Sequence, residues 1–180
     1  MKMKTRDVAL SGIFLGLLIV CSLISIPIGP VPITLSLFAV FLIGALLSPL
    51  NAVSVCALYI AIGLIGLPVF SGFGAGISKI IGPTGGYIIS YPFMAAAISL
   101  FVKYGKASIF YPIGMSAALI ICYALGASYM MISLNITLKG ALFCGVVPFI
   151  ISDGAKIALA SFLACRLNQV RERQGTKGLA

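Results

Sequence analysis

Apolar residues fill the chain in long runs, and polar residues are confined to the short segments between them. The runs predict helices over residues 8–28, 33–48, 52–67, 87–102, 109–134 and 141–163. A helix that spans a bilayer needs about 20 predominantly apolar residues. The second and third runs are shorter, so we expect them to be thinly anchored or extended at their ends. The pattern therefore predicts six transmembrane helices.

The composition excludes other classes of protein. Of the 180 residues, 61% are hydrophobic and 8% are charged. A soluble domain is about 45–50% apolar and about 25% charged, and a domain this small has too little interior to hide the surplus. We therefore expect residues 1–180 to form a single all-α integral membrane domain with short cytoplasmic tails. It has no room for a nucleotide-binding domain.

The basic residues lie at the ends of the apolar runs and predict the orientation of the chain. Six spans place both termini on the same side. Only Lys79 and Lys139 lie on the other side, and Lys156 lies inside the sixth run. By the positive-inside rule the termini are cytoplasmic, so the net charge of +9 indicates membrane orientation and not nucleic-acid binding. The residues on the side of the termini are Lys2, Lys4, Arg6, Lys103, Lys106, Arg166, Arg171, Arg173 and Lys177.

Several kinds of chemistry are missing from the chain. It contains no histidine and only three acidic residues, which excludes histidine-based catalysis. The five cysteines are scattered singly through apolar runs, with no spacing typical of metal ligands. No nucleophile–base pair is visible. We expect neither a metal site nor an enzymatic activity.

One acid and one base lie well inside a predicted span. Asp153 and Lys156 are three residues apart, so they share one face of a helix. Ionisable residues at this depth are costly and mark functional sites by default. The pair is interpreted first as the binding site of a polar ligand that needs an acceptor and a donor. A structural ion pair and a proton or ion relay are the alternatives.

A glycine-rich segment separates the third and fourth runs, from Gly66 to Tyr87. It is too rich in glycine for a stable helix and too apolar for an ordinary solvated loop. We expect an extracytoplasmic, re-entrant lid over a cavity, with a long external connector as the alternative. The first run carries Ala9, Gly12 and Gly16 on a similar face. Such small residues let helices approach closely, either within the chain or against a partner subunit.

Four sequence segments together resemble the signature of the BioY family. They are Gly66-Leu67-Pro68-Val69-Phe70-Ser71-Gly72, Gly82-Pro83-Thr84-Gly85-Gly86-Tyr87 and the Asp153-x-x-Lys156 pair, preceded by Val31-Pro32-Ile33-Thr34-Leu35. The resemblance implies a six-helix substrate-binding (S) component of an energy-coupling factor (ECF) transporter. Such a protein captures biotin with high affinity in a prokaryotic cell membrane. A coupling transmembrane subunit and two ATPase subunits, which use ATP, then drive uptake. No cofactor is implied in this chain.

The resemblance also implies roles for individual residues. Matching positions assign biotin binding to Asp153, Lys156, Ser71, Gly72, Phe73, Gly74, Thr84, Gly86 and Tyr87. Contact with the coupling subunit maps to Ala9, Gly12 and Gly16. Two alternatives stay open at this point: an S component for another vitamin, and a stand-alone biotin transporter that uses Asp153 as a proton site.

Overall fold

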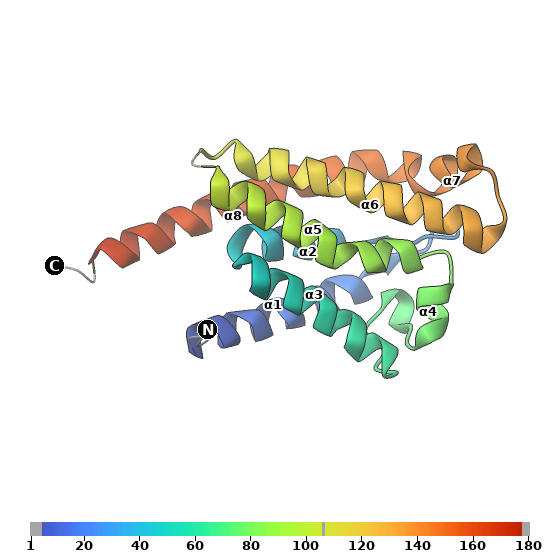
Figure 1. Cartoon of the computed structure of the whole chain (residues 1–180), viewed down its shortest axis with the longest axis horizontal. Helices are drawn as coiled ribbons and strands as arrows, with labels where there is room; N and C mark the ends of the chain where they lie inside the picture. The colour runs from blue at the N-terminus through green and yellow to red at the C-terminus, as the bar shows by residue number, and fades with distance from the viewer. Residues whose placement is uncertain (1–4, 106, 178–180) are drawn as a thin grey trace.

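The computed structural model describes residues 5–105 and 107–177, and the side chains up to residue 170. The chain forms an elongated bundle of helices, most of which run lengthwise (Figure 1). The start of α1 and the end of α8 lie at one end, and α4 and α7 lie at the other. The helices are α1 (Thr5–Leu23), α2 (Ser36–Leu46), α3 (Pro49–Leu64), α4 (Ile77–Ile81), α5 (Gly85–Tyr104), α6 (Phe110–Leu134), α7 (Leu138–Gly145) and α8 (Ile150–Lys177).

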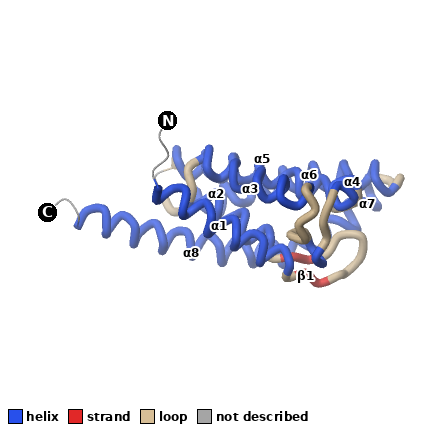
Figure 2. The backbone as a smooth tube through the Cα atoms, turned by 90° about the horizontal axis from the view of Figure 1, so that it is seen from below, coloured by secondary structure: helices blue, strands red, loops and turns tan. Residues whose placement is uncertain are grey.

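Short elements connect the helices at the end opposite the termini. The strands β1 (Ser25–Ile26) and β2 (Ile33–Thr34) pair in antiparallel fashion between α1 and α2. A 3₁₀ turn, η1 (Ser71–Phe73), precedes α4, and a second, η2 (Val147–Phe149), joins α7 to α8. Figure 2 shows β1, the long loops and α4 gathered at this end of the molecule.

A short, buried helix, α2, lies at the centre of the bundle. Helix α2 has 11 residues, and all residues from Ala39 to Ala45 are buried. It packs against α1, α3, α5 and α8. Because its residues are apolar on every side, neighbouring helices must surround it.

Glycines let α5 and α6 approach each other closely. A Cβ added at Gly86 would lie 2.6 Å from the carbonyl oxygen of Leu125, and one added at Gly126 would overlap the ring of Tyr87. A Cβ at Gly114 would lie 2.9 Å from Cβ of Phe101. The close packing holds the two helices in one register, which fixes the side chains that they present to the interior.

Among the described residues, four helical segments are long and apolar enough to cross a membrane: α1, α5, α6 and Leu138–Val170, which covers α7 and α8 as far as Val170. Helices α2 and α3 are shorter apolar helices. The predicted helical membrane class is therefore confirmed, and each predicted apolar run overlaps at least one helix, whereas α4 lies outside all of the runs.

The ends of two predicted runs, the first and the last, differ most from the structure. The first run was expected to stay helical to residue 28, but α1 ends at Leu23. Pro27 and Pro30 favour the hairpin that follows, and Ser25 pairs with Thr34. The last run is broken before Ile150, because Pro148 has no N–H for a helical hydrogen bond. Helix α8 then continues to Lys177, where a polar tail was expected.

The glycine-rich segment contains more regular structure than its composition predicts. Phe70 and Gly74 form an isolated antiparallel bridge. Between them, Gly72 and Phe73 adopt left-handed backbone angles, with φ of 67° and 56°. A left-handed Gly72 has no Cβ penalty, so the chain can reverse tightly there. The five residues of α4 follow.

Candidate functional site

The bundle encloses a cavity between its helices and the β1–β2 hairpin. The cavity holds about 580 Å³ of space free of atoms, including the part that opens to solvent. Residues of α1–α3, α5–α8 and the connecting loops line it. They are Ser22, Val31, Pro32, Thr34, Ser36, Leu37, Tyr59, Ser71, Thr84, Tyr87, Ile88, Tyr91, Cys122, Tyr123, Gly145, Phe149, Asp153 and Lys156.

Asp153, Lys156 and Tyr123 form a charged cluster at the floor of this cavity. Asp153 is fully buried, and its Oδ1 accepts a hydrogen bond from Nζ of Lys156 at 2.7 Å. Its Oδ2 accepts from the hydroxyl of Tyr123 at 2.7 Å. A single buried charge would be strongly destabilising. The paired arrangement therefore keeps both charges inside the bundle at no net charge.

Hydroxyl groups form a second polar region on the cavity wall. The hydroxyl of Tyr91 lies 2.8 Å from Oγ of Ser36, which lies 2.5 Å from Oγ1 of Thr34. The hydroxyl of Tyr59 lies 2.6 Å from Oγ of Ser22 and donates to a backbone carbonyl. These hydroxyl groups hydrogen-bond to one another, which fixes their positions on the cavity wall.

Aromatic rings give the same wall an apolar face. The rings of Tyr59 and Tyr91 stack with centroids 6.1 Å apart, and Phe70 meets Tyr59 edge-on at 5.4 Å. The hydroxyl of Tyr87 donates to the carbonyl of Gly145 at 2.9 Å, which joins α5 to α7. Apolar walls with a few fixed polar groups are typical of small-molecule sites.

A second hollow, here called the outer vestibule, adjoins the cavity. Both are lined by Pro32, Ser71 and Thr84. The β1–β2 hairpin and the glycine-rich segment form its walls. The two are joined by a hydrogen bond from the backbone N–H of Gly72 to Oγ of Ser25, at 3.2 Å. The cavity therefore faces the loops at the end opposite the termini.

The predicted ligand residues fall into three groups. Asp153, Lys156, Ser71, Thr84 and Tyr87 line the cavity. Gly72 and Phe73 line only the outer vestibule, where the Phe73 side chain is 69% exposed. Gly74 and Gly86 line neither hollow.

Structural roles are visible for the last two glycines. Gly74 exchanges two backbone hydrogen bonds with Phe70. Gly86 packs against Tyr129 of α6. The three small residues proposed for partner contact, Ala9, Gly12 and Gly16, are exposed along α1. Nothing in the described chain lies within 4 Å of a Cβ added at Gly12 or Gly16.

Sequence reasoning missed Tyr123, Tyr59 and Ser36 as cavity residues. A tyrosine in an apolar run is more often part of the core or the membrane interface. Tyr123 lies in the middle of the fifth run, far from both interfaces, and this depth was the available signal. Ser36 directly follows the Val31–Leu35 block.

The site has the chemistry of a binding pocket. Among the described residues, no three His, Cys, Asp or Glu side chains are close enough to hold a metal ion. The cluster offers a carboxylate acceptor with ammonium and phenol donors, enclosed by apolar walls. It fits a neutral ligand group that both donates and accepts hydrogen bonds.

Comparisons with known proteins agree on one family. The BioY family profile matches residues 1–173. The chain is 38% identical over 165 residues to the probable biotin transporter BioY of Pyrococcus horikoshii, covering 92% of this chain and 98% of that protein. It is 36% identical to the biotin transporter BioY of Thermotoga maritima, with 92% and 97% covered.

A solved structure extends the similarity to the fold. The crystal structure of the S-component for biotin from an ECF-type ABC transporter aligns with a TM-score of 0.86 at 29% identity. The alignment covers 93% of this chain and 95% of that one. The resemblance seen in the sequence blocks is thus confirmed along nearly the whole chain. The chain is an integral membrane protein that belongs to the BioY family.

Proposed function

We propose that this chain captures biotin as the S component of an ECF-type transporter. One observation carries the proposal. In a chain of the BioY family, the cavity has a buried, hydrogen-bonded ion pair at its floor, Asp153 with Lys156 at 2.7 Å. No catalytic arrangement is needed for this role, and partner ATPases supply the energy for uptake.

The chemistry of biotin suits the two parts of the cavity. Its ureido ring is neutral, donates two N–H groups and offers a carbonyl acceptor. Asp153 accepts from the ureido N–H groups, and Lys156 or Tyr123 donates to the ureido carbonyl. The thiophane ring and the chain then lie against Val31, Leu37 and the aromatic wall. Ser71, Gly72, Phe73 and Thr84 cover the opening from the loops.

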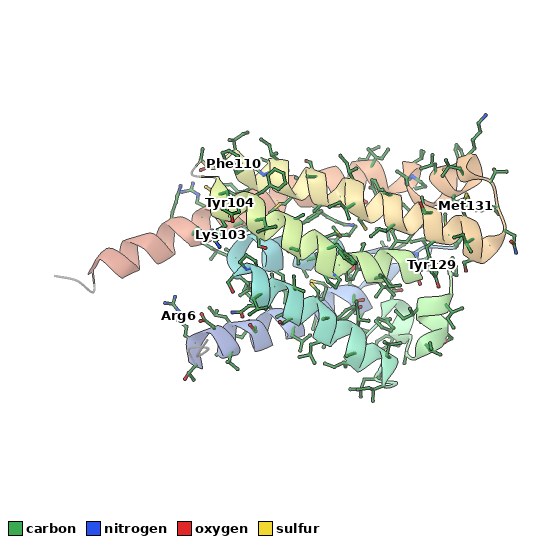
Figure 3. All side chains as sticks on the ribbon, viewed as in Figure 1. Arg6, Lys103, Tyr104, Phe110, Tyr129 and Met131 are labelled. Atoms are coloured by element: carbon green, nitrogen blue, oxygen red, sulfur yellow. The ribbon has the colours of Figure 1, made fainter. Side chains whose placement is uncertain are left out.

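We further propose six membrane spans within one domain, with α2 and α3 as the two short ones. Their 11 and 16 residues correspond to about 17 and 24 Å at 1.5 Å per residue. Figure 3 shows Arg6 and Lys103 at the same end of the bundle, with Tyr129 and Met131 toward the other. This supports cytoplasmic termini and a glycine-rich lid on the outside of the prokaryotic cell membrane. Lys2, Lys4 and Lys106, which also count toward this orientation, lie outside the described residues.

The exposed face of α1 is proposed to contact the coupling subunit. Ala9, Gly12 and Gly16 leave this face without bulk, so a partner helix can approach closely. Two ATPase subunits complete the proposed assembly. Uptake should then depend on those subunits and not on a proton gradient, which separates this function from a stand-alone transporter.

The experiment is a titration of labelled biotin against the purified chain in detergent. The wild type should bind tightly, and Asp153→Asn should weaken binding about 10- to 150-fold, because a lost bond to a charged group costs about 1.5–3 kcal/mol. Asp7→Asn, at the far end of α1, is the matched control and should bind normally. A folded wild type that does not bind biotin would overturn the proposal.

A further inference from the structure

The outer vestibule contains a single charged side chain. Of the residues that line it, only Lys79 of α4 carries a charge. Its methylene stem lies on the backbone of Gly74, where a Cβ would come within 2.9 Å of Cδ. The backbone carbonyl of Lys79 accepts a hydrogen bond from Thr84, at 3.3 Å. These contacts hold α4 and its lysine at the junction with the cavity.

The ammonium of Lys79 has no partner among the described residues. Among the described residues, no ion pair or hydrogen bond engages it, and the only ion pair is that of Asp153 with Lys156. The other acidic residues, Asp7 and Glu172, belong to α1 and α8 near the opposite end of the bundle. A free cation at the mouth of a binding cavity is therefore available to a ligand.

The floor of the cavity cannot neutralise an additional charged group. Asp153 and Lys156 neutralise each other, so an anionic group placed beside them would leave a net buried charge. Such an uncompensated charge is strongly unfavourable. A ligand with one neutral and one anionic end should enter with the neutral end first and leave the anion toward the open vestibule.

We propose that Lys79 recognises the carboxylate of the ligand, which fixes the ligand's orientation with its ureido ring at Asp153. This inference rests on the proposed function, because it takes biotin as the occupant. Lys79 acts as a specificity residue: it favours an ionised carboxylate over a neutral amide at the same position.

The test compares the dissociation constants of biotin and biotinamide, which share both rings and the chain but end in an anionic carboxylate and a neutral amide, respectively. Lys79→Met keeps the stem on Gly74 and removes the charge. It should weaken biotin binding about tenfold, at the lower end of the range for a charged hydrogen bond, and leave biotinamide within about twofold. Lys79→Arg should retain the preference for biotin. The control is Lys139→Met, an exposed lysine of α7 that lines neither hollow.

Each outcome bears on one of the two proposals. Equal weakening of both ligands in Lys79→Met would mean a structural role for the side chain and would overturn the inference. Unchanged binding of both ligands would overturn it as well, while leaving biotin capture intact. If the wild type binds neither ligand, the proposed function itself fails.

Discussion

The floor of the cavity is built from the middle of α6 and the first turns of α8, whereas its roof is built from loops and two-residue strands. At the floor, Asp153 is fully buried and accepts hydrogen bonds from Lys156 and Tyr123. At the roof, one hydrogen bond of 3.2 Å joins Gly72 to Ser25. Segments with few buried contacts open at low free energy. The difference predicts that the floor holds the ureido ring in a fixed position and that the roof controls access to it.

Breaking the ion pair at the floor should produce the largest effect. Asp153→Asn leaves the buried ammonium of Lys156 without its charge partner, which costs about 3–5 kcal/mol. The double variant Asp153→Asn/Lys156→Met should regain most of this stability without regaining biotin binding. Thermal unfolding in detergent measures the first effect and labelled-biotin binding the second. A double variant no more stable than Asp153→Asn would contradict this account of the pair.

The packing of α5 against α6 should respond to a single methyl group. Gly86→Ala places a Cβ 2.6 Å from the carbonyl oxygen of Leu125, and overpacking of this kind costs about 1–3 kcal/mol. Gly154→Ala is the matched control, since nothing in the described chain lies within 4 Å of its Cβ. That variant should be neutral, or more stable by up to about 1 kcal/mol through helix propensity. Equal unfolding temperatures for the two variants would show that α5 and α6 do not pack closely at Gly86.

Loosening the roof should change rates more than stability. Ser25→Ala removes the acceptor of the Gly72 N–H, and a hydrogen bond contributes about 0.5–1.5 kcal/mol. Biotin should dissociate about threefold faster in a chase experiment, with little change in the unfolding temperature. Ser11→Ala, which removes a buried hydroxyl without a hydrogen-bond partner in the described chain, should leave the rate unchanged. A slower or unchanged rate of biotin dissociation in Ser25→Ala would contradict the role of the roof in ligand access.

The floor and the roof also differ in how well the sequence predicts them. The floor contained the only acid and base deep inside an apolar run, Asp153 and Lys156, and their spacing placed them on one face of a helix. No local sequence pattern identified Tyr123 as a site residue, because its contact with Asp153 depends on how α6 packs against α8. The Ser36–Tyr91 contact joins residues 55 apart in the chain, which no local pattern predicts.

The roof was harder to predict because its elements are short. Strands of two residues, such as Ser25–Ile26, are too short to show an alternating pattern. The five residues of α4 lie among glycines, which lower helix propensity. The long extension of α8 had the opposite problem: its residues after 165 are polar, so they were interpreted as a tail, although a polar helix can continue into water.

A structure of the chain with biotin bound tests the central claim most directly. The account predicts the ureido ring within hydrogen-bonding distance of Asp153 and the carboxylate directed toward Lys79 in the outer vestibule. Biotin bound outside the cavity, or with its carboxylate against Lys156, would contradict it.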